Sequence, residues 1–402
     1  MIFNTTWFLI FFVGAYVAFL GIPGAQARFA FLLLASAVFH FYFAGPAGVG
    51  PIVVIALCTF GFGLWLPRLP LGSWQRRLVF FLAIAVPTLA LIGYKYRGLL
   101  PFSIPFPGKG LSKSGLGAAQ VALPLAISFF TFEYVHYLTD VYHGAKPIRS
   151  PFRFAFFSIF FPSIVSGPIK RFQPFLGQVE GCVERPRVEG ALRGAAQVLV
   201  GFFKKLVIAD NATLAIDLLE KRAVPSRADV ALLLFLLSVR ILFDFSGYSD
   251  IAIGLGRMLG IELPQNFRYP YIARNISDFW QRWHISLSRW IRDYIYIPLG
   301  GGQRGILVKT SNLALTMFLC GLWHGAAWHF GVWGLYHGVG LATHSVWEKS
   351  PVGRRFAALP FSRWIGMAVT DLFVAYGWLL FFYPMQRVAV LTKALIGWTG
   401  AS

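Results

Sequence analysis

Long apolar stretches separated by short polar connectors dominate the chain. Several stretches approach the roughly 20 residues that a helix needs to cross the hydrocarbon core of a membrane. The pattern predicts an all-α, polytopic integral membrane protein with about eleven transmembrane or re-entrant helices. The expected segments are Trp7–Leu20, Phe29–Ala44, Val49–Leu66, Leu78–Tyr94, Ala118–Tyr142, Phe154–Gly167, Ala195–Leu219, Val230–Leu259, Ile306–Gly321, Ala326–Val346 and Trp364–Pro384.

Two of these segments differ from an ordinary crossing. Phe154–Gly167 is short and contains Pro162, so we expect a re-entrant or half-spanning segment there. Trp7–Leu20 follows no basic leader and precedes no convincing cleavage site, which favours a retained first helix. Because no fixed repeat and no soluble second domain is recognisable, we predict one membrane-embedded domain over residues 1–402.

The composition supports a membrane protein and changes how the charge is interpreted. The chain is 57% hydrophobic and only 13% charged, with a mean hydropathy of +0.63, whereas soluble domains are about 25% charged. A net charge of +20 could indicate nucleic-acid binding. The Lys and Arg residues, however, lie mostly in short connectors, where the positive-inside rule and anionic headgroups account for them. We therefore expect membrane lipids, and no nucleic acid, as partners.

The first connectors predict an orientation. The Gly45–Gly50 turn carries no charge, whereas Pro67–Arg77 carries three arginines. Placing the basic loop in the cytoplasm puts the N-terminus outside. The 95–113 loop, with four Lys or Arg residues, then falls outside and argues mildly against this topology.

One histidine lies inside a long uncharged run. No Asp, Glu, Lys or Arg occurs from Thr310 to Trp347, and His324 lies near the middle in the sequence GLWHG. The run is nearly twice as long as one crossing, so we expect two helices with a break between them. An ionisable residue at membrane depth usually faces the protein interior or a wet cavity, which makes His324 a functional candidate. A structural histidine bonded to a carbonyl is the alternative.

A second histidine lies in the segment FWQRWHISLSRWIRDYIYI, Phe279–Ile297. Helical periodicity predicts one continuous helix with an aromatic stripe beside a basic stripe, which is typical of an interfacial helix. His284 and Ser288 fall between the stripes, and a lone histidine is more often structural than catalytic. The aromatic stripe contains Trp280, Trp283, Leu287, Trp290 and Tyr294, and the basic stripe contains Arg282, Arg289 and Arg292.

Further ionisable residues lie in the apolar segment RILFDFSGYSDIAIGL. Arg240 and Asp244 are spaced i,i+4 and are expected to neutralise each other. Asp250 has no obvious local partner, so it is a candidate for orienting a histidine or arginine of another segment. His329 and His337 do not share the helical face of His324, and HExxH is absent, so no metal site is expected. The serine-hydrolase motif GxSxG and the P-loop are also absent.

Four sequence blocks resemble the membrane-bound O-acyltransferase family, in its bacterial branch typified by alginate O-acetyltransferase and the D-alanyl-transfer membrane proteins. Together with the hydropathy pattern they cover most of residues 120–345. The blocks are FFPSIVSGPIKRF at 160–172, FDFSGYSDIAIGL at 243–255, NFRYPYIARNISDFWQRWHISLSRWIRDYIYIPLGG at 266–301 and GLWHGAAWHFGVWGLYHG at 321–338.

The resemblance implies a helical bundle that encloses a tunnel. It assigns the family's signature histidine to His324 and the second catalytic histidine to His284. A neutral imidazole can remove a proton from an alcohol near neutral pH, so His324 is expected to be the catalytic base. Supporting or substrate-binding roles are expected for Asn266, Asp278, Arg282, Trp283, Ser288, Asp250 and Trp323.

The resemblance also implies the reaction. It predicts transfer of acetyl from a cytoplasmic donor, with acetyl-CoA as donor substrate and no bound cofactor, across a bacterial inner membrane to an exported or cell-wall polysaccharide. The expected partner is an extracytoplasmic acetyltransferase or esterase-like protein. Two alternatives stay open: D-alanyl transfer from a carrier protein to an envelope polymer, and a non-enzymatic component of polysaccharide export.

Overall fold

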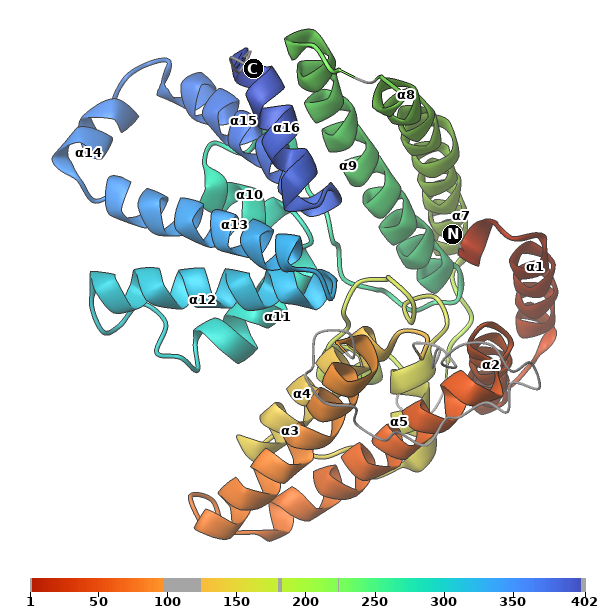
Figure 1. Cartoon of the computed structure of the whole chain (residues 1–402). Coiled ribbons are helices and arrows are strands. Elements are labelled where there is room, and N and C mark those ends of the chain that lie inside the picture. Colours follow the sequence, from red (N-terminus) through yellow and green to blue (C-terminus); the bar gives the residue numbers. More distant parts are fainter. Residues whose placement is uncertain (1, 97–123, 180–182, 223, 399–402) are drawn as a thin grey trace, which may run out of the picture. The chain divides into compact units, whose positions relative to one another are not determined.

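The computed structural model describes residues 2–96, 124–179, 183–222 and 224–398, and within these residues it contains helices and no β-strand (Figure 1). The prediction of an all-α fold is confirmed. The chain divides into two compact units. Unit 1 comprises Met1–Val198 with Ile251–Pro264, and unit 2 comprises Leu199–Asp250 with Gln265–Ser402. Two helices contribute residues to both units, α7 (Val188–Phe202) and α9 (Arg227–Met258).

Unit 1 is built around a long helix that is broken at a glycine. Gly45 adopts φ 64° and ψ 171° at the middle of the 41-residue α2, so each half is about 30 Å long. The two predicted segments Phe29–Ala44 and Val49–Leu66 are the two halves of this helix. The helices of this unit, besides its share of α7 and α9, are α1 (Thr6–Gly21), α2 (Ala25–Trp65), α3 (Trp74–Lys95), α4 (Ile127–Tyr142), α5 (Pro151–Ile159) and α6 (Phe172–Gly177).

Unit 2 contains most of the blocks that the sequence singled out. A π-helical segment, Phe203–Ala209, joins α7 to α8, and a second one, Arg292–Tyr296, follows α11. The α-helices of this unit, besides its share of α7 and α9, are α8 (Asp210–Glu220), α10 (Ile276–Arg282), α11 (Ile285–Ile291), α12 (Ile306–His324), α13 (Trp328–Trp347), α14 (Pro351–Ala357), α15 (Ser362–Phe382) and α16 (Met385–Ile396).

Five helical segments of the described chain are long and apolar enough to cross a membrane. The predicted number of about eleven crossings is not confirmed. Phe154–Gly167 forms only the nine-residue α5 and a non-helical turn after it, and the basic 95–113 loop lies largely outside the described residues. The five segments are Ala25–Arg68, Trp74–Lys95, Arg227–Met258, Ile306–His324 and Ser362–Phe382.

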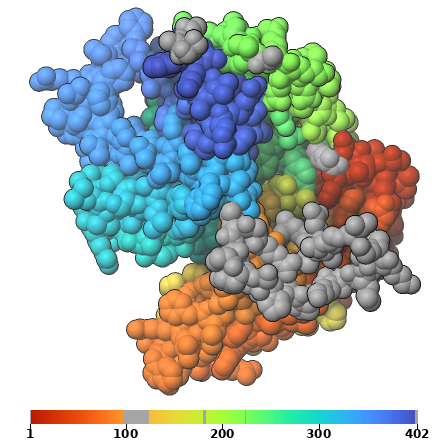
Figure 2. Space-filling view, viewed as in Figure 1, coloured from red at the N-terminus to blue at the C-terminus, as the bar shows by residue number. Residues whose placement is uncertain are grey.

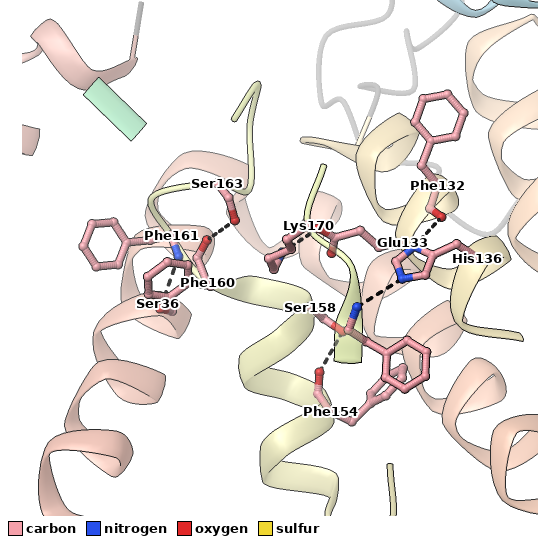
Figure 3. Close-up of polar contacts among 11 residues, drawn as sticks. Ser36, Phe132, Glu133, His136, Phe154, Ser158, Phe160, Phe161, Ser163 and Lys170 are labelled. Carbon is pink, nitrogen blue, oxygen red and sulfur yellow. Dashed lines mark hydrogen bonds and ion pairs between the residues drawn. The ribbon is translucent and has the colours of Figure 1, made fainter. Parts of the chain in front are cut away.

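A buried ion pair ties the chain after α5 to helix α4 in unit 1. Lys170 Nζ lies 2.5 Å from Glu133 Oε1, and both side chains are buried (Figure 3). The ammonium also lies 5.1 Å and 5.5 Å from the ring centroids of Phe157 and Phe175. One turn further along α4, His136 Nε2 accepts a hydrogen bond from the backbone N–H of the residue that opens α6, at 3.3 Å. Segment 160–171, which is not helical, is therefore held by side-chain contacts.

A buried arginine of unit 1 donates hydrogen bonds to carbonyls at the ends of α4 and α2. Arg76, which is 3% exposed, donates hydrogen bonds to the carbonyls of Val141 and Tyr142 at the end of α4. It also donates to the carbonyls of Leu66 and Leu69, just after α2. Carbonyls at a helix end lack intrahelical partners, and a guanidinium can satisfy several of them at once. One of the three arginines that predicted the loop's orientation therefore stabilises the fold.

Candidate functional site

The site begins at a helical hairpin in unit 2, α12 and α13, whose helices lie directly against each other (Figures 1 and 2). The break covers residues 325–327, as the sequence predicted for the uncharged run. Two glycines make the close contact possible: a Cβ atom on Gly321 would stand 2.9 Å from Gly334 Cα and would overlap the Phe330 carbonyl. The hairpin therefore packs backbone against backbone up to the turn that holds His324.

His324 is the last residue of α12 and is surrounded by aromatic rings. Its ring centroid lies 4.7 Å from Trp323, 5.2 Å from Trp333 and 5.1 Å from Phe381. The residue is half-buried. An imidazole in such surroundings is shielded from bulk water on several sides while part of it stays accessible.

His284 occupies a break that the sequence did not predict. The expected continuous helix over Phe279–Ile297 is wrong, because α10 ends at Arg282 and α11 begins at Ile285. His284 itself adopts φ 41° and ψ 55°, in the left-handed region. For a residue with a Cβ atom this conformation costs about 1–2 kcal/mol, so surrounding contacts must hold it. The three tryptophans of the stripe are buried inside unit 2, and they do not form the exposed face of an interfacial helix.

Asn266 provides the contacts that hold the His284 turn. Its backbone carbonyl accepts the N–H of Ile285 at 2.9 Å, and its side-chain Oδ1 accepts the N–H and hydroxyl of Ser286 at 3.2 and 2.7 Å. Its Nδ2 donates to Ser249 Oγ at 3.2 Å, and Asn266 is completely buried. The first two helical residues after His284 are thus fixed by one asparagine, which explains why the helix breaks here.

The two histidines lie close to the same tryptophan. The ring of Trp323 is 6.3 Å from His284 and 4.7 Å from His324, between ring centroids. Burial holds the pKa of His284 well below its ordinary value, and repulsion from His324 when that ring is protonated lowers it further, so the His284 imidazole is neutral. His284 is 2% exposed, and its Nε2 has no hydrogen-bond partner among the described residues. A buried ring nitrogen of this kind is available to a substrate group.

The other predicted residues of the 266–301 block support the turn or lie beside it. Asp278 accepts from Arg282 Nε at 2.7 Å and from the backbone N–H of Arg274 at 3.1 Å. Ser288 Oγ donates to the Trp283 carbonyl at 3.1 Å, across the break. Asp278, Arg282 and Ser288 therefore stabilise the backbone on both sides of His284.

Asp244 and Asp250 of α9 pair with lysines that the local spacing of the sequence did not indicate. The expected Arg240–Asp244 pair is wrong: Asp244 lies 2.8 Å from Lys205 Nζ, while the Arg240 guanidinium lies 4.9 Å above the ring of Phe382. Asp250 pairs with Lys204 at 2.6 Å. Both lysines belong to the π-helical segment, whose extra residue per turn the apolar periodicity of the chain does not reveal.

One further histidine of the hairpin is buried beside the site. The His337 ring lies 5.0 Å from Trp333 and 5.3 Å from Trp280, and neither ring nitrogen has a hydrogen-bond partner among the described residues. In contrast, His329 Nδ1 bonds to the Leu380 carbonyl at 3.0 Å. The position of His337 in the chain gave no reason to place it near His324. The Trp333 ring contacts both histidines, and its contact with His324 forms only in the folded hairpin.

Comparison with known proteins identifies the family. Residues 82–385 match the membrane-bound O-acyltransferase family, MBOAT. The chain is 35% identical over 382 residues to a Pseudomonas fluorescens protein named "probable alginate O-acetylase", covering 95% of this chain and 72% of that protein. It is 33% identical over 318 residues to a peptidoglycan O-acetyltransferase of Helicobacter pylori, covering 72% of this chain and 60% of that protein.

A relative with a different acyl group is also similar. The chain is 32% identical over 273 residues to a teichoic acid D-alanyltransferase of Bacillus subtilis, covering 64% of this chain and 68% of that protein. The matched residues include both histidine turns and several apolar helices. The chain therefore belongs to the membrane-bound O-acyltransferase family and is a multi-pass membrane acyltransferase.

Proposed function

We propose that the protein transfers acetyl from a donor on the cytoplasmic side of a bacterial inner membrane for O-acetylation of an exported or cell-wall polysaccharide. The observation that carries the proposal is the approach of His284 and His324 to one tryptophan inside unit 2. The choice of acetyl follows the relatives, since the alginate O-acetylase match covers 95% of the chain and the D-alanyltransferase match covers 64%.

His324 acts as the general base in this proposal. Its neutral imidazole takes the proton of an acceptor hydroxyl as the oxygen attacks the acetyl carbonyl carbon. The carbon–sulfur bond of the thioester then breaks, and the imidazolium returns the proton to the leaving thiolate. The aromatic rings around His324 limit access of water, which favours transfer to the acceptor over hydrolysis of the donor.

His284 supports the transfer as a neutral hydrogen-bonding group. Its lowered pKa keeps it uncharged, so it does not repel the imidazolium that forms at His324. Its unpartnered Nε2 can bind a polar atom of the substrate. The left-handed turn held by Asn266 fixes the direction of the ring.

Acetyl-CoA is the donor substrate that we propose, and no resident cofactor takes part. The acceptor is either the polysaccharide itself or an extracytoplasmic acetyltransferase or esterase-like partner that completes the transfer. The phosphates of the donor require cationic partners, and the basic residues of 268–304 are candidates, among them Arg289, which is exposed.

The decisive experiment replaces His324. His324→Ala should lower ester-linked acetate in the envelope polysaccharide roughly 10²–10⁴-fold, the usual cost of losing a general base. The control is His344→Ala on the same hairpin, far along α13 from the turn, and it should retain acetylation. Acetate and D-alanine are both measured in the alkaline hydrolysate of cells with equal amounts of membrane-inserted protein. Near-wild-type acetate with His324→Ala removes the base assignment, and loss of D-alanine in place of acetate would change the acyl group.

A further inference from the structure

A pocket of about 830 Å³ lies at the break of α2 in unit 1. Its walls come from both halves of α2 and from α4 and α5, and every lining residue belongs to unit 1. Apolar side chains form most of the surface, among them Val49, Ile52, Phe60, Phe154 and Ile159. The pocket is therefore distinct in its residues from the histidine site, and the acyl-transfer mechanism does not use it.

Polar side chains interrupt this apolar wall at a few positions. His40 is 5% exposed and lines the pocket, yet neither ring nitrogen has a hydrogen-bond partner among the described residues. The His40 ring packs edge-on against Phe130, at 5.6 Å between centroids. The hydroxyl of Tyr134, one helix away on α4, lines the same pocket beside the side chain of Ser158. Buried polar atoms are rarely left unpaired in proteins, so the ring nitrogens of His40 indicate a ligand with a polar group.

The position of the pocket indicates where its ligand comes from. Val38, Phe41 and Leu57 line it and are also exposed large hydrophobic residues of α2, a helix of a membrane-spanning segment. Such residues face the bilayer, so the pocket opens toward lipid. Each half of α2 is long enough for one crossing, which places Gly45 near a membrane surface. His40, five residues earlier, lies about 7 Å along the helix from Gly45, just inside the hydrocarbon boundary, where an ester group of a lipid held in the pocket can reach it.

We propose that this pocket binds one glycerophospholipid of the surrounding membrane. One acyl chain lies along the apolar wall formed by the second half of α2 and by α5, and an ester carbonyl accepts a hydrogen bond from a ring nitrogen of His40. The ligand needs both an acyl chain and a hydrogen-bond acceptor. The apolar wall excludes a polar molecule, and His40 would stay unpaired beside a pure hydrocarbon. The bound lipid would fill the space that Gly45 opens between the two halves of α2.

The test uses the full chain in nanodiscs of phosphatidylethanolamine and phosphatidylglycerol that contain a trace of phosphatidylethanolamine with a diazirine on one acyl chain. Cross-links are located by mass spectrometry after illumination. In the wild type they should concentrate in residues 37–60 and 151–159. His40→Phe keeps a ring of similar size and should lower this labelling about 2- to 10-fold, the change that one hydrogen bond of usual net strength gives.

Two tryptophan variants keep the test independent of how His40→Phe folds. Ala56 lines the pocket, and Ala56→Trp should block labelling by filling it. Val54, 60% exposed on the same helix and not among the lining residues, provides the matched control Val54→Trp. Thermal melting is measured on each preparation. Equal labelling of the wild type, Ala56→Trp and Val54→Trp would mean that only bulk lipid contacts this helix, and the proposal would be wrong.

Discussion

Removing the charge of Lys170 should destabilise unit 1 strongly. Lys170 and Glu133 are 1% and 7% exposed at a separation of 2.5 Å, so Lys170→Met leaves a buried carboxyl group that must either stay charged without a cation or take up a proton. Breaking a buried pair in this way costs about 3–5 kcal/mol. For a unit of roughly 200 residues, the loss corresponds to a fall in melting temperature of about 6–20 °C.

Replacing both partners should recover most of this loss. The Lys170 ammonium already lies against the rings of Phe157 and Phe175, so methionine at position 170 meets apolar neighbours. With Glu133→Met and Lys170→Met together, neither buried charge remains. An apolar replacement of a whole buried pair is often neutral or stabilising. The double variant should therefore melt well above Lys170→Met, and the coupling between the two sites should be a few kcal/mol.

The measurement is the fraction of monodisperse protein that survives heating in detergent, followed by size-exclusion chromatography, for the wild type, both single variants and the double variant. Lys146→Met, which removes an exposed lysine of the connector before α5, is the control and should leave the melting temperature unchanged. A Lys170→Met protein that melts with the wild type would refute the reasoning. A double variant no more stable than the single variant would show that Lys170 acts through packing and not through its charge.

Two further predictions concern the site and the orientation. Asn266→Ala removes the side-chain acceptor of Ser286 and should lower kcat roughly 10²-fold by misplacing His284, with KM little changed. Ser249→Ala loses only the hydrogen bond from Asn266 Nδ2 and should have a much smaller effect. Equal kcat values for both variants would contradict a positioning role of Asn266. In a cysteine-free background, Ala47→Cys should react with an impermeant thiol reagent in intact spheroplasts. Leu71→Cys should not react, because the loop that contains Leu71 is predicted to be cytoplasmic, although the residue is 74% exposed. The opposite labelling pattern overturns the predicted topology.

The apolar pattern predicted helices well where a segment forms one uninterrupted helix. The break at His324 was predictable because an uncharged run of that length exceeds one crossing and glycines flank the histidine. The break at His284 was not, since its segment keeps helical periodicity through the turn. Asn266, eighteen residues earlier, fixes the first two residues after the turn, and a contact so distant in the chain leaves no trace in local periodicity.

The ion pairs show a second limit of local spacing. An i,i+4 rule paired Arg240 with Asp244, but Asp244 pairs with Lys205 on another helix. Helix-to-helix distance, and the π-helical turn that carries Lys205, decide which partners meet. In the same way, two residues that line the α2 pocket, His40 and Tyr134, lie about ninety positions apart in the chain, so local spacing does not bring them together.

The glycine contact of the α12–α13 hairpin limits how this enzyme can change. Gly321 and Gly334 bring two backbones together without any side chain between them, so no substitution on that face can shift His324 by a fraction of an ångström without separating the helices. Evolution within the family is therefore expected to keep the position of His324 constant. A new acyl group or acceptor must be accommodated by residues outside this glycine contact, in the His284 turn and on α15, where a side chain such as Phe381 can be exchanged. Efforts to redesign acyl specificity should begin there.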